Sequence, residues 1–92
     1  MTNLEVFTSN VLKECNGYVF NFSNKKNIEY ITTRLENVLV NEFGERILEK
    51  LEVDISYNMG EKYCVNIQFR DKQTGDFTNI FDECIYNDLK NI

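Results

Sequence analysis

The chain has 92 residues, a hydrophobic fraction of 42% and a net charge of −5 from 10 basic and 15 acidic side chains. This length predicts a single domain over residues 1–92 that buries roughly 60–65% of the surface of its unfolded chain. An acidic balance without a basic cluster counts against a protein that binds the nucleic-acid backbone. The absence of histidine removes the commonest general base and the commonest metal ligand.

The cysteines and the apolar runs indicate in which cellular compartment the protein is expected. Cys15, Cys64 and Cys84 are odd in number and lack C-x-x-C spacing, so we expect reduced thiols and no disulfide framework. Cys15 and Cys84 fall on apolar helical stripes and are expected in the core, whereas Cys64 falls on the polar face of a strand. No apolar run is long enough for a membrane span, and MTNLEVFTSN is unlike a signal peptide. We expect the cytoplasm of a host cell or a virion, without secretion by a signal peptide.

The N-terminal third predicts a helix and then a short strand. Leu4, Phe7 and Val11 follow helical spacing over residues 3–15, and Thr2 or Asn3 can cap the start. Asn16-Gly17 is a suitable end, because glycine accepts the left-handed conformation that closes many helices. Aromatic and β-branched residues at 18–22 then predict a strand.

A second helix is expected over residues 25–41. Its apolar stripe, which runs over four turns, consists of Ile28, Ile31, Leu35, Val38 and Leu39. Gly44 follows the stripe and ends the pattern. The next stretch, ERILEK at 45–50, either extends this helix or leads into the following strand.

The segment LEVDISYNMGEKYCVNIQF, residues 51–69, predicts a β-hairpin. Odd-numbered residues are mainly apolar on both arms and even-numbered residues are mainly polar, which is the period of a half-buried strand. A loop at 58–62 would pair 57 with 63, 55 with 65, 53 with 67 and 51 with 69. Both apolar sets then lie on one side of the sheet.

The tail after the polar turn RDKQTGD, residues 70–76, has two interpretations. Phe77, Ile80 and Cys84 fit a helical stripe that Asp76 could cap, and we favour this mostly helical tail. Alternatively, DFTNIF is a third strand that precedes a short helix. The predicted order is therefore αβαββα, an α+β domain with an antiparallel sheet of three or more strands and two to three helices packed on it.

The sequence contains no recognisable catalytic or cofactor-binding motif. Glu52 and Asp54 could share a cation, but a solvated strand face is the simpler interpretation. Asp71 and Asp76 lack the ligand spacing of an EF-hand and indicate a turn instead. We expect a protein that is not an enzyme, with no cofactor, no metal site, no evident small-molecule substrate, and no direct contact with nucleic acid or membrane.

Protein–protein interaction is the remaining class. An antiparallel sheet has edges that accept a partner strand, and the polar face of the hairpin can be presented to a partner. The predicted partner-binding residues on that face are Glu52, Asp54, Ser56, Asn66 and Gln68. The expected partner is a protein, through self-association or within a larger assembly.

Two long runs carry a resemblance to a family. The runs NGYVFNFSNKKNIEYITTRLENVLVNEFGERILEKLEVDISYN and KYCVNIQFRDKQTGDFTNIF resemble the C-terminal domain of the sheath proteins of contractile bacteriophage tails. The matching features, over residues 16–81, are the strand Tyr18-Val19-Phe20, a helix capped at Asn24, its stripe from Ile28 to Leu39, the junction at Gly44, and the hairpin. The hairpin loop is short, and the large N-terminal part of a sheath protein is absent.

This resemblance implies a small virion or tail-assembly protein that acts through subunit contacts and strand exchange. The Asn-, Lys- and Ile-rich composition without proline suits an AT-rich phage genome. It equally suits a phage-encoded inhibitor of host defence, of the anti-CRISPR kind, or an immunity protein or antitoxin that covers the surface of its partner.

Overall fold

The computed structural model describes residues 2–16, 25–59 and 63–92, with the backbone alone at 15–16, 25–27, 56–59 and 63–66. The described elements are α1 (Asn3–Asn16), α2 (Lys25–Phe43), α3 (Ile47–Lys50), β1 (Leu51–Met59), β2 (Tyr63–Asp71), β3 (Phe77–Thr78) and α4 (Glu83–Lys90). In these residues the three strands form an antiparallel sheet in the order β1-β2-β3. The predicted α+β class is confirmed, and the strand expected at 18–22 lies outside the described residues.

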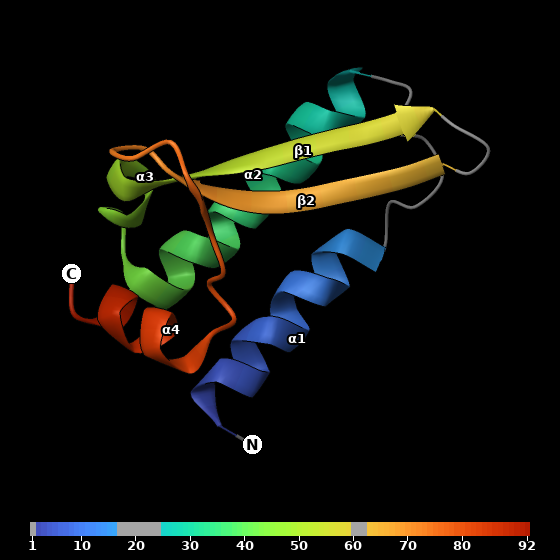
Figure 1. Cartoon of the computed structure of the whole chain (residues 1–92). Helices are drawn as coiled ribbons and strands as arrows, with labels where there is room; N and C mark the ends of the chain where they lie inside the picture. The colour runs from blue at the N-terminus through green and yellow to red at the C-terminus, as the bar shows by residue number, and fades with distance from the viewer. Residues whose placement is uncertain (1, 17–24, 60–62) are drawn as a thin grey trace.

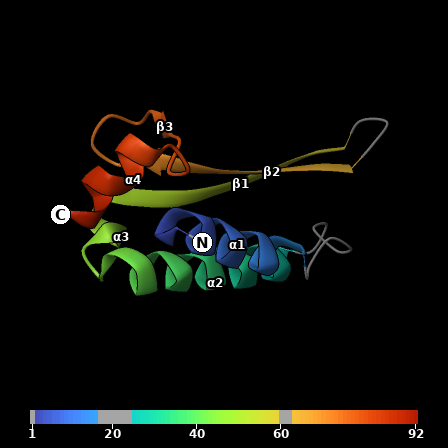
Figure 2. The same cartoon turned by 90° about the horizontal axis from the view of Figure 1, so that it is seen from below.

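The elements form two layers. Figures 1 and 2 show α1 and α2 side by side beneath one face of the sheet. Helix α4 lies beside the sheet, at about the level of the strands and not of the two helices. An ion pair between the helices, with Arg34 Nε 2.6 Å from Glu14 Oε2, joins α2 to α1. One face of the hairpin is therefore covered by helices, as the predicted alternation of its apolar residues requires.

Helices α1 and α2 form where their apolar stripes predict them. Thr2 Oγ1 accepts a hydrogen bond from the Glu5 amide at 3.1 Å and caps the start of α1, as expected. The buried residues of the two helices are spaced four apart: Phe7, Val11, Ile31, Leu35 and Leu39. Gly44, at a φ of +92°, follows α2 in the left-handed conformation that glycine adopts without strain.

Aromatic rings form the centre of the core at the end of the helical layer near α4. The fully buried ring of Phe7 lies 5.2 Å from that of Phe43 and 5.7 Å from that of Tyr86, between ring centroids. These three rings come from α1, α2 and α4, so they hold the C-terminal helix against the other two. Edge-to-face and tilted arrangements at this separation add to the stabilisation from burial alone.

The observed hairpin register corrects the predicted one. Residue 51 lies opposite 71, 53 opposite 69, 55 opposite 67, 57 opposite 65 and 59 opposite 63. The strands are thus shifted by two residues, and three residues, 60–62, separate them instead of five. A shift of two keeps every residue on its predicted face, so the hydrophobic pattern alone cannot distinguish the two registers.

Residues 45–50 lead into the strand, the second of the two expected alternatives, and do not continue α2. They make a turn after Gly44 and the short helix α3, which leads directly into β1. Ile47 is fully buried, and Leu51 is 1% exposed. Burial of these two side chains fixes where the hairpin begins relative to α2.

The preferred prediction of a mostly helical tail is wrong, and the alternative of a strand followed by a short helix is confirmed. β3 pairs Phe77 with Arg70, and α4 begins only after Asp82. Asp82, rather than Asp76, is the N-cap, because its Oδ1 accepts hydrogen bonds from the amides of Cys84 and Ile85. The later start changes the helical phase, so that Tyr86 is buried and Cys84 is exposed, contrary to the prediction for Cys84.

Candidate functional site

The even-numbered residues of β1 and β2 face away from α1 and α2. We call this surface the outer face and define it by five described residues: Glu52, Asp54, Gln68, Arg70 and Phe77. In Figure 2 the helices α1 and α2 lie on the opposite side of the sheet. Phe77 is 54% exposed on this face, so its ring adds apolar area to an otherwise polar surface.

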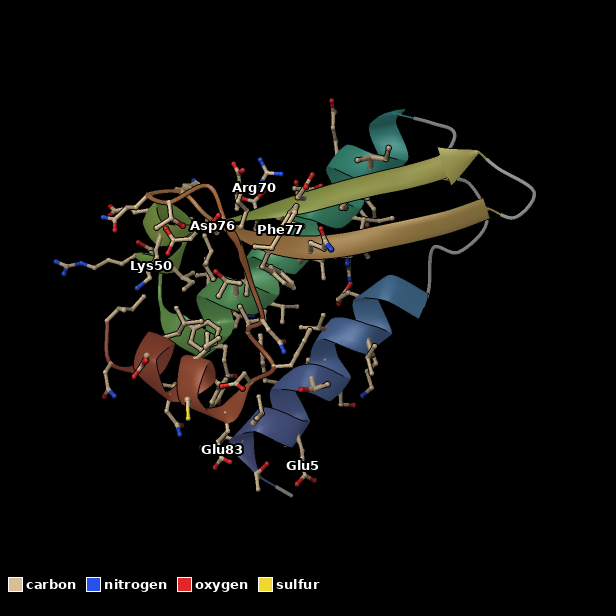
Figure 3. All side chains as sticks on the ribbon, viewed as in Figure 1. Glu5, Lys50, Arg70, Asp76, Phe77 and Glu83 are labelled. Atoms are coloured by element: carbon tan, nitrogen blue, oxygen red, sulfur yellow. The ribbon has the colours of Figure 1, made fainter. Side chains whose placement is uncertain are left out.

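Arg70 is the centre of the outer face. Its Nη2 lies 3.2 Å from Asp54 Oδ2 and its Nε lies 3.8 Å from Glu52 Oε1. Its guanidinium carbon also lies 4.8 Å from the centroid of the Phe77 ring, and Figure 3 shows the two residues together over the start of the hairpin. Two carboxylates and one ring therefore hold the guanidinium in a defined position while 38% of the side chain stays exposed.

The structure places the predicted partner-binding residues on one face. Glu52, Asp54 and Gln68 lie on the outer face, where Asp54 is opposite Gln68. Ser56 and Asn66 lie opposite each other further along the hairpin and share the parity of the outer face, with their backbones alone described. The register predicted from the sequence paired Glu52 with Gln68, Asp54 with Asn66 and Ser56 with Cys64, and the shift of two residues corrects all three pairings.

Arg70 and Phe77 were missed as members of this face. Arg70 was predicted to lie in the polar turn at 70–76, and Phe77 in a helix or, as the alternative, in a third strand. The available signal was the parity of the second strand, because Asn66, Gln68 and Arg70 continue one alternation. The cation that Glu52 and Asp54 could share is thus the guanidinium of their own chain.

The free edge of β1 is the second feature of the site. Lys72 N donates to Lys50 O at 2.8 Å, and hydrogen-bonded pairs alternate along an antiparallel ladder, so even-numbered residues of β1 bond to β2. The odd-numbered residues, 51 to 59, therefore direct their backbone N–H and C=O groups to the other edge. Among the described elements no strand pairs with that edge.

A second polar cluster joins α4 to α2. The Tyr86 hydroxyl donates to the Glu42 carboxylate, and Lys90 Nζ lies 2.9 Å from the same group. Burial raises the pKa of Glu42, but the bonds from Tyr86 and Lys90 outweigh it and hold that pKa below its ordinary value. Burial and the bond to Glu42 raise the pKa of Tyr86. Because Tyr86 is 4% exposed, its bond to Glu42 holds α4 against α2.

Grooves border the helices in the described part of the chain. A groove of about 240 Å³ lies between α1 and α2, and a larger groove of about 570 Å³ lies between the start of α1 and α4. Tyr86 and Lys90 line the larger groove together with Glu5 and Glu83, which Figure 3 labels at the ends of their helices. Lys90 is already paired with Glu42, and the groove is lined by both acidic and basic side chains. The lining therefore does not indicate one class of ligand.

The described residues include no group of three or more Cys, Asp or Glu side chains that could hold a metal ion. None of the helices in the described ranges is long and apolar enough to cross a membrane. The chemistry available on the outer face is recognition: one positioned cation, two carboxylates, an amide and an exposed ring.

Comparison with family models, with curated proteins and with solved structures gives no match to this chain. The resemblance to the sheath domain therefore stays a prediction.

Proposed function

We propose that this protein is a non-enzymatic interaction module that binds a partner protein through its outer face, as a small structural or assembly protein of a bacteriophage virion or tail. The biological setting comes from the resemblance of residues 16–81 to the sheath domain. The mode of binding comes from the hairpin, whose outer face carries the predicted partner-binding residues.

The positioned guanidinium of Arg70 is the single feature that most favours this function. Arginine and aromatic residues are enriched among the residues that dominate binding energy in protein interfaces. Arg70 is held by Asp54 and Phe77 before any partner arrives, so binding loses less side-chain entropy than it would with a free arginine. Exposed ion pairs contribute little to stability, so the contacts of Arg70 act mainly on the shape of this surface.

Mass spectrometry of purified particles tests this proposal. We expect the protein in particles from cells that carry its gene, at a constant ratio to the tail proteins after density-gradient purification. Its absence from particles, together with co-purification with a host nuclease complex, would contradict the assembly role and support the inhibitor.

Binding through the outer face is tested by adding positive charge to it. Gln68→Lys combined with Asn66→Lys alters the face without removing a partner of Arg70, so the fold should survive. We expect an unchanged circular dichroism spectrum and at least a tenfold loss from particles. A fold that survives together with full incorporation would show that the outer face faces solvent.

A further inference from the structure

Among the described residues, the β1 edge lacks most of the devices that usually block an exposed strand, and its two charges, Glu52 and Asp54, are paired with Arg70. Residues 51–59, LEVDISYNM, contain no lysine, proline or glycine, and their pairing with β2 is continuous, without a bulge. The opposite side of the sheet differs, because β3 covers Phe69 and Arg70 of β2. β1 is therefore the long edge of the sheet whose backbone groups can pair with another strand.

We propose that β1 pairs with β1 of a second copy, antiparallel across a two-fold axis that passes through Ile55. This places 55 opposite 55, 53 opposite 57 and 51 opposite 59 of the other copy. These are the odd-numbered residues whose backbone groups point to the free edge, so the hydrogen-bonding phase is correct. The two three-stranded sheets become one continuous sheet.

The sequence of β1 is complementary to itself in this register. On the covered face, apolar or aromatic residues lie opposite each other: Ile55 opposite Ile55, and Val53 opposite Tyr57. On the outer face, Asp54 lies opposite Ser56 and Glu52 opposite Asn58, so no two acids meet. An axis through Val53 would instead place Glu52 opposite Asp54 in both halves and is disfavoured.

The second copy also enlarges the surface offered to a partner. Nine residues span about 30 Å, and two strands are about 10 Å wide, so one hairpin offers a face of about 300 Å². A stable interface uses about 800 Å² of each partner, and two joined hairpins approach that area. In this respect the inference rests on the proposed function, whereas its physical test is independent of it.

Two substitutions at one position test the register. Ser56→Asp places an acid opposite Asp54 twice in the dimer and should weaken dimerisation about fivefold, whereas Ser56→Lys should tighten it about fivefold. Asn66→Asp adds the same charge to the outer face on β2, one strand from the edge, and should leave the dimerisation constant unchanged. Analytical ultracentrifugation over about 1–100 μM measures all four proteins.

The expected result is a dimer of the wild type with the order Ser56→Lys, wild type, Ser56→Asp in affinity. A monomer at every concentration, or a dimer in which the two Ser56 variants do not move in opposite directions, overturns the inference. Either of those results leaves the proposed function standing if the protein is present in particles. A dimer with the expected order of affinities, together with absence of the protein from particles, would support the β1 pairing and contradict the proposed function.

Discussion

Arg70 Nη2 and Asp54 Oδ2 lie 3.2 Å apart, diagonally across the hairpin, because Asp54 is paired in register with Gln68. This contact orients the guanidinium along the outer face toward the β1 edge. Both side chains are more than one-third exposed, so the contact contributes more to the shape of the surface than to folding.

Arg70→Gln separates these two contributions. We expect the free energy of unfolding, measured by urea denaturation, to fall by less than about 1 kcal/mol, because an exposed ion pair is weak. Incorporation into particles should fall at least tenfold, as expected for an arginine at the centre of an interface. Arg46→Gln removes the same charge from an exposed turn and should change neither quantity.

Phe7→Ala tests the aromatic core. Phe7 is fully buried between rings from α2 and α4, so we expect the free energy of unfolding to fall by about 3–5 kcal/mol. Leu12→Ala, on the same helix at a side chain that is 52% exposed, should change it by less than about 0.5 kcal/mol. Equal losses in the two variants would mean that α1 does not pack as described.

Glu42 makes stability depend on acid pH. Its pKa in the folded protein is lowered, so its contribution to stability is complete above the ordinary pKa of a glutamate and is lost as the pH falls through the lowered value. We expect the urea midpoint to fall between about pH 6 and about pH 3, and Glu42→Gln to reduce that fall. Glu49→Gln, at an exposed position, is the control, and an identical profile for both variants would argue against the Glu42 cluster.

The hairpin register has a direct spectroscopic test. Opposed Hα atoms are closest in the pairs that do not exchange hydrogen bonds, which in β1 and β2 are the odd-numbered ones. We expect nuclear Overhauser effects between the Hα atoms of 53 and 69 and of 55 and 67. Effects between 53 and 67 and between 55 and 65 would restore the register predicted from the five-residue loop.

The periodicity of the sequence predicts the helical layer well. The stripes of α1 and α2 are long and regular, so Phe7, Val11, Ile31, Leu35 and Leu39 could be assigned to the core from spacing alone. The faces of the hairpin were also predictable, because alternation survives a shift of two residues. Its register was not, since the length of the turn decides it.

The C-terminal segment shows why short elements escape this kind of prediction. β3 has two residues, Phe77 and Thr78, and its pairing with β2 depends on the turn at Gly75, whose φ is +76°. A helical stripe drawn through residues 77–89 ignores the break between β3 and α4 at 79–82, which is why Cys84 was expected in the core and Tyr86 was not. The position of Arg70 between Asp54 and Phe77 likewise depends on tertiary pairing.

The most direct test of docking through the outer face compares two double variants in purified particles by quantitative mass spectrometry. Gln68→Lys with Asn66→Lys changes the outer face, and Asn10→Lys with Asn37→Lys adds the same charge to exposed positions of α1 and α2. We expect the first variant to be depleted at least tenfold and the second to match the wild type. Equal incorporation of both folded variants would contradict docking through the outer face.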